Sequence, residues 1–537
     1  MTEPTPSLRR VPGLSPEQAA DIVAKAIIEQ PATIEPWWAW PAEVTSVLLR
    51  GPVDRAAQPF TLLAVAAARW PGRPAMVDED GAISYGELRS RTEALADQLG
   101  RRAGPGHAVG ILCRNGRGFV QAVFGPALLG ADVVLLNTDF HTDALAAALS
   151  THRIKTVVCD DEFTDRVKAA DGSVTVIEPV AVNAHRGGPR PKVAAAGRIV
   201  LLTSGTTGQP KGVPRKPEIA SALGVGASIL DRTGLRIGSR IAVAVPMFHG
   251  LGFGMLILTV ALGGTALTLR RFEAEATLAQ ASQHRADAFT AVPVMLARIL
   301  DLPDDVRARH PLPSLRVVIS SGARLDPSLA RRFMDAYGDV IYNGYGSSEV
   351  GIGSLATPAD LREAPETVGK PVAGCPVRIL DEDGKTVGPN VTGRVFVGGE
   401  LTFDAYTGGE TKDMVADMTS TGDMGYFDEA GRLYIVGRED DMIVSGGENV
   451  YPRAVENALA EHPDVADNAV IGVPDEDYGE RLAAFIVPRP DASLDAAELR
   501  DYLKDKVSRY EQPRDIEIVS EIPRNPAGKV LRNELAE

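Results

Sequence analysis

A segment rich in glycine and hydroxyl residues, Thr203–Val213, has the composition of a loop that binds phosphate. It reads Thr-Ser-Gly-Thr-Thr-Gly-Gln-Pro-Lys-Gly-Val and follows the apolar run Val200–Leu202, which is typical of a strand end. Glycines let successive backbone N–H groups point into one concavity, and the hydroxyls add further donors. Lys211 adds positive charge. The spacing differs from that of a Walker A loop, in which Gly-Lys-Ser/Thr follows four variable residues.

A second segment of interest lies near the end of the chain, where Lys529 stands in Pro-Arg-Asn-Pro-Ala-Gly-Lys-Val. A lone lysine there is normally a solvated charge, and a Gly/Ser/Thr-rich stretch is often a plain linker. A linker, however, needs neither Pro-Lys-Gly at its end nor a strand that leads into it. Two such segments far apart in one chain therefore indicate ATP chemistry that a mobile C-terminal piece completes.

The elements around these segments alternate between apolar strands and helices. Ser84 and Glu87 form a capping-box pattern, which predicts a helix that starts at this point and runs through Leu99. The strand–helix–strand rhythm implies an α/β fold with a parallel sheet. The predicted strands are 108–113, 133–136, 156–159, 240–245 and 315–320, and one predicted helix covers 119–129.

The pattern changes after about Pro371. Short strands at 377–381, 394–398 and 432–437, separated by Gly/Asp turns, predict a β-rich subdomain. Beyond a polar junction at 437–441, helices at 454–461 and 496–508 alternate with strands at 467–473, 483–487 and 515–519, which predicts a compact α+β unit. We expect an N-terminal extension (1–55), a large α/β N-terminal domain (56–439) and a small mobile C-terminal domain (440–537) that carries Lys529.

The composition is that of an ordinary globular protein, with 537 residues, 44% hydrophobic and 24% charged. The net charge of −15 argues against a non-specific nucleic-acid partner. Three scattered cysteines without a CxxC pair argue against a disulfide framework or zinc site and fit a reducing cytosol. They are Cys113, Cys159 and Cys375.

No signal peptide is evident, and the apolar stretch 251–269 is broken by glycines, so we expect a cytoplasmic protein. The tryptophans Trp37, Trp38 and Trp40 leave a choice open. They favour either peripheral membrane contact or, as we prefer, an N-terminal strap packed on its own domain. A homodimer is also left open.

Taken together, these segments and several more resemble the signatures of the adenylate-forming superfamily, which comprises acyl-CoA synthetases, peptide-synthetase adenylation domains and luciferases. The resemblance covers nearly the whole chain after Phe60 and keeps the family's order. It rests on 203–213, 246–252, 320–325, 342–349, 420–423 with 437–438, 442–452 and 526–529. It implies ATP-dependent activation of a carboxylic acid, with release of pyrophosphate, followed by transfer of the acyl group to CoA.

The resemblance also assigns roles in the nucleotide site, and each has a physical reason. Glu349 would bind Mg²⁺, a hard cation that screens repulsion between carboxylate and phosphate. Tyr345 offers an aromatic face to adenine, and Asp423 can accept hydrogen bonds from ribose hydroxyls. The residues implied for ATP or AMP are Thr203, Ser204, Gly205, Thr206, Thr207, Lys211, Gly322, Ala323, Tyr345, Gly346, Ser348, Asp423 and Arg438.

Further roles follow for the reaction steps. Lys529 would stabilise negative charge on the carboxylate and the α-phosphate as the transition state forms. It would then have to leave, so the C-terminal domain would rotate about a hinge at Asp440. The implied CoA-binding residues are Ser445, Gly446, Gly447 and Tyr478.

The acid would lie near His249, Val292, Pro293 and Gly351, on an apolar surface without a lysine or arginine for a second carboxylate. A medium- or long-chain fatty acid is the first expectation and an aryl acid the second. The same motifs would also suit a ligase that loads a carrier protein in trans or stops at the adenylate. A non-catalytic ATP-binding regulator on the same fold is a further possibility, because a fold does not fix a function.

Overall fold

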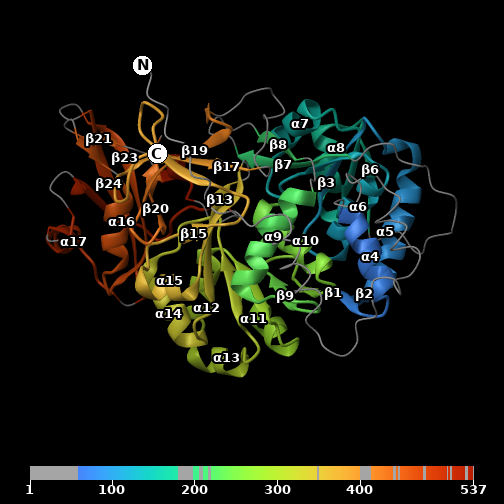
Figure 1. Cartoon of the computed structure of the whole chain (residues 1–537), viewed down its shortest axis with the longest axis horizontal. Coiled ribbons are helices and arrows are strands. Elements are labelled where there is room, and N and C mark those ends of the chain that lie inside the picture. The colour runs from blue at the N-terminus through green and yellow to red at the C-terminus, as the bar shows by residue number, and fades with distance from the viewer. Residues whose placement is uncertain are drawn as a thin grey trace, which may run out of the picture.

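A large N-terminal domain and a small C-terminal domain make up the chain (Figure 1). The computed structural model describes residues 59–179, 197–204, 210–215, 219–347, 350–399, 413–439, 443–445, 448–450, 452–475, 479–490, 492–504, 506–507, 511–525 and 530–535. The predicted α/β class with these two domains is confirmed. The exact domain bounds stay predictions, and the Trp-rich segment lies outside the described residues.

A six-stranded sheet has the order β6-β5-β3-β4-β7-β8. All its neighbours are parallel except the β7–β8 hairpin. Helix α5 begins at the predicted capping box, in which the Ser84 hydroxyl accepts from the Glu87 N–H. The strands are β3 (Ala108–Leu112), β4 (Asp132–Leu135), β5 (Thr156–Cys159), β6 (Thr175–Ile177), β7 (Ile199–Ser204) and β8 (Pro210–Arg215). The helices here are α5 (Tyr85–Leu99), α6 (Arg117–Leu128), α7 (Thr142–Thr151) and α8 (Thr164–Ala170), with short 3-10 turns at Gly100–Arg102 and Asp161–Phe163.

A nine-stranded sheet has the order β15-β14-β13-β12-β11-β9-β10-β1-β2. Its centre, from β13 to β1, is parallel, and its edges are antiparallel. The strands are β1 (Pro74–Asp78), β2 (Gly81–Ser84), β9 (Arg240–Val243), β10 (Thr265–Leu267), β11 (Ala288–Ala291), β12 (Val317–Ser320), β13 (Ile341–Ser347), β14 (Gly351–Ala356) and β15 (Lys370–Pro371). The helices are α4 (Pro59–Arg69), α9 (Ile219–Thr233), α10 (Gly250–Ala261), α11 (Ala274–Gln283), α12 (Pro293–Leu300), α13 (Asp304–Arg309), α14 (Pro327–Tyr337) and α15 (Pro358–Glu363).

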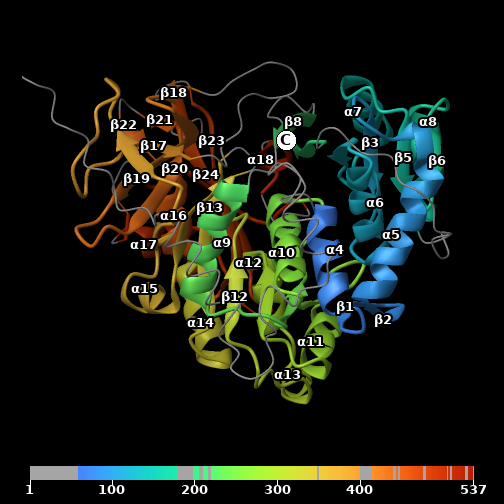
Figure 2. The same cartoon turned by 45° about the vertical axis from the view of Figure 1, so that its right-hand side comes forward.

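A layer of helices separates the two large sheets. Helix α6 packs on β3 and β4, α10 packs on β9, and α4 contacts both helices. Their apolar side chains join one continuous buried core, in which Phe119, Phe124 and Leu256 are almost fully inaccessible. Figure 2 shows this layer from the side. Burial of this area on both sides fixes the two sheets relative to each other.

The predicted β-rich subdomain after about Pro371 is confirmed as a five-stranded antiparallel sheet. Its order is β16-β17-β19-β18, and β20 pairs with β19. The strands are β16 (Val377–Leu380), β17 (Gly393–Gly398), β18 (Met414–Val415), β19 (Met418–Phe427) and β20 (Leu433–Arg438).

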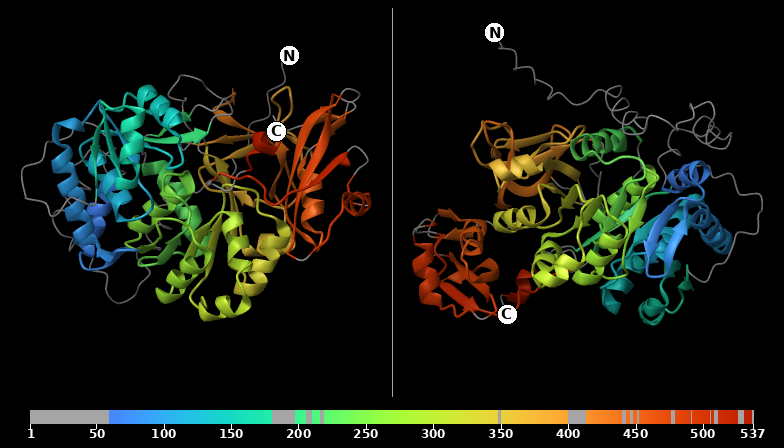
Figure 3. Two further views of the ribbon diagram at one scale, coloured as in Figure 1. Left: turned by 180° about the vertical axis from the view of Figure 1, so that it is seen from behind. Right: turned by 90° about the horizontal axis from the view of Figure 1, so that it is seen from below.

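The C-terminal domain has a sheet of order β22-β21-β24-β23, with β25 parallel to β24. Side chains along its strands alternate between two small cores. Val470 and Leu482 face α16 and α17, while Ile471 and Phe485 face the chain end, with Val530 and Leu535. The elements are β21 (Ile443–Ser445), β22 (Glu448–Val450), α16 (Pro452–Ala460), β23 (Val465–Asp475), β24 (Gly479–Pro488), α17 (Ala496–Leu503), β25 (Asp515–Ile518) and α18 (Arg532–Leu535). Figure 3 shows the domain from behind and from below.

Several predicted elements are shorter than expected, among them the strand predicted at 315–320, which begins at Val317. Strand β9 ends at Val243 instead of 245, because the chain there leaves the sheet toward His249. Helix α17 ends at Leu503 instead of 508, and the Gln512 amide caps this end by donating to the Leu503 carbonyl at 2.8 Å. None of the helices in the described part of the chain combines the length and the apolar character that a membrane span requires.

Candidate active site

Four adjacent strands of the nine-stranded sheet bring predicted site residues to one edge. Strands β9, β11, β12 and β13 are parallel neighbours, so their carboxyl ends meet. His249 follows β9, Val292 and Pro293 follow β11, and Gly322 and Ala323 follow β12. Tyr345 lies in the second half of β13. Ligands of open α/β sheets bind at this edge, so the fold gathers the predicted acid-binding and nucleotide-binding residues where a substrate can reach them.

Three of the predicted nucleotide residues contact one another directly. The Tyr345 hydroxyl donates to Asp423 Oδ2 at 2.5 Å. Asp423 and Arg438 are register partners across β19 and β20, and their charged groups lie 3.6 Å apart. The two strands thus present a carboxylate, a phenol and a guanidinium together. A carboxylate held in this way can accept hydrogen bonds from a vicinal diol such as that of ribose.

The electrostatics of this trio keep its protons in place. Burial first, and the Asp423 charge second, raise the pKa of Tyr345 well above its ordinary value. The phenol therefore remains a hydrogen-bond donor at every physiological pH. Arg438 is less enclosed, with 39% of its side chain exposed against 15% for Asp423. It is therefore the member of the trio most open to an incoming ligand.

Two predicted glycines stand where a side chain would be obstructed or strained. A Cβ on Gly346 would lie 1.9 Å from the Gly351 carbonyl oxygen, so the β13–β14 hairpin can close only with glycine at this position. Gly322 has a φ of 84°, in the region that favours glycine. It turns the chain directly after β12, beside Ser320, whose buried hydroxyl has no hydrogen-bond partner.

His249 is the N-cap residue of α10, and its ring is half-buried beside the Phe248 ring at a centroid distance of 4.4 Å. Its Nε2 atom is buried without a hydrogen-bond partner. Burial lowers the pKa of His249 to about 4. The imidazole is therefore neutral near pH 7, next to the positive end of the α10 dipole. Both features suit the neighbourhood of a carboxylate.

Asn115, which the sequence motifs do not single out, positions this histidine. It follows β3 of the six-stranded sheet, is almost fully buried, and reaches across 130 residues of sequence. Its side-chain amide donates to the Val245 carbonyl at 2.9 Å, and its carbonyl accepts from the Met247 N–H at 2.7 Å. These bonds fix the turn between β9 and His249. No local pattern indicates this role, because the contact depends on how two sheets meet.

The described parts of the predicted phosphate-binding segment lie on two antiparallel strands. Strands β7 and β8 pair so that Thr203 lies opposite Lys211 and Ser204 opposite Pro210. Of Thr203, Ser204, Lys211 and Ser445 the structure describes the backbone, each within a strand. The remaining predicted residues lie outside the described part of the chain: Gly205, Thr206, Thr207, Ser348, Glu349, Asp440, Gly446, Gly447, Tyr478 and Lys529.

The residues on either side of the predicted Lys529 segment are held on the C-terminal sheet. Arg524 and Val530 form an isolated bridge. The Arg524 guanidinium donates to both carboxylate oxygens of Asp467, on β23, at 2.7 and 3.0 Å. The flanks of the segment are therefore attached to the sheet of the C-terminal domain.

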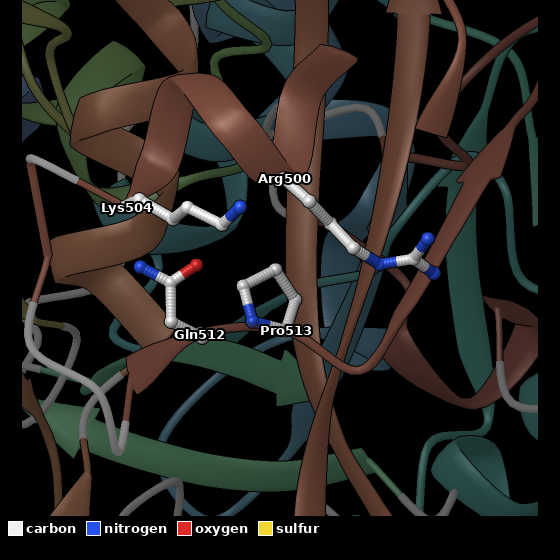
Figure 4. A pocket seen from close by; sticks show the side chains of 4 residues that line it. All are labelled: Arg500, Lys504, Gln512 and Pro513. Carbon is white, nitrogen blue, oxygen red and sulfur yellow. The ribbon is translucent and has the colours of Figure 1, made fainter. Parts of the chain in front are cut away.

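A surface hollow of about 360 Å³ lies elsewhere, between α17 and the start of β25 (Figure 4). Arg500, Lys504, Gln512 and Pro513 line it. The polar groups are engaged with the protein: Arg500 donates to the Arg514 carbonyl and Lys504 to Asp501. The Arg500 guanidinium also points away from the Lys504 side chain. We therefore assign no ligand to this hollow.

This two-domain α/β fold, with a phenol–carboxylate–guanidinium trio beside the strand ends, defines a nucleotide-binding protein of the adenylate-forming type. The chain matches the family "AMP-binding enzyme" over residues 63–407 and "AMP-binding enzyme C-terminal domain" over residues 454–529. The chain belongs to this AMP-binding enzyme family.

Relatives of known activity extend this result. The chain is 30% identical over 485 residues to a 2-succinylbenzoate–CoA ligase from Bacillus subtilis (strain 168), with 87% of this chain and 95% of the relative covered. It is 32% identical over 470 residues to a feruloyl-CoA synthase from an Amycolatopsis species, with 84% and 93% covered.

Solved structures agree with these similarities. The o-succinylbenzoate CoA synthetase from Bacillus subtilis, in complex with its acyl-adenylate intermediate, superposes with a TM-score of 0.78 at 29% identity. The match covers 89% of this chain and 98% of that one. The same synthetase is also known in complex with ATP and a magnesium ion.

Proposed function

We propose that this protein is an AMP-forming acid–CoA ligase, which activates a carboxylic acid with ATP and passes the acyl group to CoA. The convergence of His249, the Gly322 loop and the Tyr345–Asp423–Arg438 trio at one edge of the sheet carries this proposal. An acid-binding group and a ribose-binding group on neighbouring strand ends can hold two substrates side by side. Such positioning accounts for much of the rate in phosphoryl-type chemistry.

In this proposal the described residues bind and orient, and they do not attack the substrate. Asp423 and Arg438 hold the ribose, Tyr345 lies against the nucleoside, and neutral His249 faces the acid. An Mg²⁺ ion would be held by Glu349 together with phosphate oxygens, since this hard cation prefers oxygen ligands. Magnesium bound there would screen the charge on the reacting phosphate.

Lys529 and the hinge complete the proposed cycle. Lys529 stabilises charge during adenylation, and rotation about Asp440 then brings the Ser445–Gly447 segment and Tyr478 to the site for CoA. The pinned flanks of Lys529, at Arg524 and Val530, support this account because they tie the lysine to the movement of the whole domain.

The proposed substrate is an apolar monocarboxylic acid, with an aryl acid placed first. The sequence alone favours a fatty acid, but the similar ligases are named for 2-succinylbenzoate and ferulate, which are aromatic acids. The apolar side chains near His249 suit an aryl acid and a fatty acid alike, since Phe248 is buried and Leu251 and Phe253 are partly buried.

Acid-dependent exchange of pyrophosphate into ATP tests the activation step, with a panel of aryl acids and of fatty acids of increasing length. AMP and thioester are then measured with and without CoA. Exchange with an aryl acid and CoA-dependent thioester is the expected result. Exchange without thioester points to a carrier protein or to release of the adenylate. If no acid in the panel supports exchange, the protein is a nucleotide-binding regulator and the proposal fails.

A further inference from the structure

A small polar interface joins the C-terminal domain to the nucleotide loop of the large domain. Arg324, in the loop after β12, forms an ion pair with Glu456 on α16 at 3.5 Å. Only 22% and 17% of the two side chains are exposed. Beside it, the Asn457 amide donates to Glu366 at 2.6 Å. Helix α16 also contacts β20, the strand that ends in Arg438.

The position of Arg324 gives this interface a direct connection to the site. It follows Gly322 and Ala323, which are predicted to flank the nucleotide, and it precedes α14. A nucleotide that orders this loop would also order the Arg324 guanidinium. Because Glu456 belongs to the C-terminal domain, the ion pair can relate nucleotide binding to the placement of that domain.

We propose that Arg324–Glu456 and Glu366–Asn457 form a polar latch that holds the C-terminal domain over the nucleotide site for the adenylation step. This inference rests on the proposed function for its kinetic consequences. The latch residues act as positioning residues, because none of them need touch the reacting atoms. Closure of the domain over the ribose trio would exclude water from the acid and ATP.

Arg453 lies beside the latch on the C-terminal domain. It lies one turn before Glu456 and Asn457, at the start of α16, where a positive charge is unfavourable to the helix dipole. Among the described residues it makes no hydrogen bond or ion pair. Burial, followed by repulsion from Arg324, lowers the pKa of Arg453 to about 10, while attraction to Glu456, Glu366 and Asp423 acts in the opposite sense. The charged form is thus disfavoured where it lies.

The carboxylates near Arg453 are already engaged by separate donors. Glu456 also accepts from the Val470 N–H at 3.1 Å, and Asp423 accepts from Tyr345. One Nη atom of Arg324 is buried without a partner, as is the Asn457 carbonyl oxygen. The docked interface is thus incompletely satisfied. Favourable and unfavourable contacts together leave the docked and undocked arrangements close in free energy. A domain that docks and leaves in every catalytic cycle requires such a small difference.

Three variants test the latch: Arg324→Gln, Glu456→Gln and the double variant. Glutamine at 456 keeps the acceptor for Val470, so the C-terminal domain should fold normally. Each single variant is expected to lower the rate of pyrophosphate exchange about two- to fivefold, the range of a partly exposed ion pair. Thioester formation from supplied acyl-adenylate should not slow. The double variant should be no worse than either single one, because both remove the same interaction.

One further variant is the control. Arg309→Gln removes an ion pair of similar length, 3.6 Å to Glu275, that lies within the large domain, so it should change neither half-reaction. The latch is overturned if Arg324→Gln and Glu456→Gln slow both half-reactions equally, or if their effects add.

Docking can also be measured without catalysis. The native cysteines are buried, so dyes can be placed on new cysteines at the exposed positions Asp305 and Ala497. Energy transfer between them should report a mainly docked wild-type protein and a larger undocked fraction in Arg324→Gln. An unchanged distribution would refute the latch. Absence of exchange with every acid would instead refute the proposed function and leave this distance test standing.

Discussion

The trio Tyr345–Asp423–Arg438, which we propose binds the ribose, and the interface between the domains use the same kinds of side chain in opposite ways. In the trio, Tyr345, Asp423 and Arg438 pair within the large domain. At the interface, Arg324 pairs with Glu456 across the domains, and two polar atoms there stay unsatisfied. The first arrangement is complete before any ligand binds. The second is only partly satisfied even when docked.

This difference follows from what each region must do. A binding site gains affinity when its groups are already ordered, because little further entropy is lost on binding. A moving domain must instead have two arrangements that differ by little free energy. Substitutions in the trio should therefore change nucleotide affinity, while substitutions on the C-terminal domain should change how the two half-reactions are balanced.

The largest effect expected on the mobile side is that of Lys529→Ala. Loss of one preorganised charge donor typically lowers a rate by about 10²–10³-fold, so acid-dependent pyrophosphate exchange should fall by this amount. Thioester formation from supplied acyl-adenylate should survive, because the lysine has left by then. Lys504→Ala is the control, since Lys504 is 68% exposed and pairs with Asp501 three residues before it. Equal loss of both half-reactions would contradict the moving-domain account.

The corresponding change on the preorganised side is Asp423→Asn. The amide keeps the size of the side chain but removes the charge that faces Arg438 and the Tyr345 hydroxyl. Hydrogen bonds to charged groups contribute about 1.5–3 kcal/mol, so the KM for ATP should rise by about one to two orders of magnitude. The KM for the acid should change little. A matched control is Asp428→Asn, which breaks the Asp428–Arg432 pair at the far end of the same hairpin. If both variants raise the KM for ATP alike, the ribose assignment is wrong.

How much of this could be predicted from the sequence depends on how local each signal is. The capping box at Ser84 involves residues three apart, so the pattern alone predicts it, and the structure has it. The motifs also indicate the fold class and the residues at the strand ends. By contrast, Asn115 acts across 130 residues, and Arg324 meets Glu456 only when two domains dock. Such contacts depend on the packing of whole elements and leave no periodic or spacing signal.

A third prediction concerns Asn115, which belongs to the preorganised region although it follows a strand of the six-stranded sheet. Asn115→Ala removes both bonds to the segment before His249 and leaves a buried carbonyl and N–H unpaired, at a cost of about 1–3 kcal/mol each at most. The free energy of unfolding should fall, and the KM for the acid should rise about tenfold, an effect of similar free energy.

Gln280→Ala is the comparison that separates stability from positioning. Gln280 also bridges two backbone carbonyls of the large domain, those of Val77 and Thr268, but away from His249. The Gln280→Ala variant should have a lower free energy of unfolding and an unchanged KM for the acid. If Asn115→Ala behaves in the same way, Asn115 has only a structural role.

The smallest expected effect is the pH dependence of stability that His249 contributes. Burial lowers its pKa to about 4 in the folded protein, against an ordinary value of 6.5, so the unfolded chain binds the proton more readily. This contribution is complete above pH 6.5 and is lost as the pH falls toward 4. Between pH 7.5 and 5 it should amount to about 2 kcal/mol at most, at 1.36 kcal/mol per pH unit.

Urea unfolding of the wild type and of His249→Phe at both pH values isolates this contribution. Subtraction is necessary because burial also lowers the pKa of His152. His152 therefore also makes the protein less stable as the pH falls. The wild type should lose more stability on acidification than the variant does. Equal losses would mean that His249 is protonated as readily in the folded protein as in the unfolded chain. The imidazole would then carry charge near the acid, and the description of His249 as a neutral group beside the acid would be wrong.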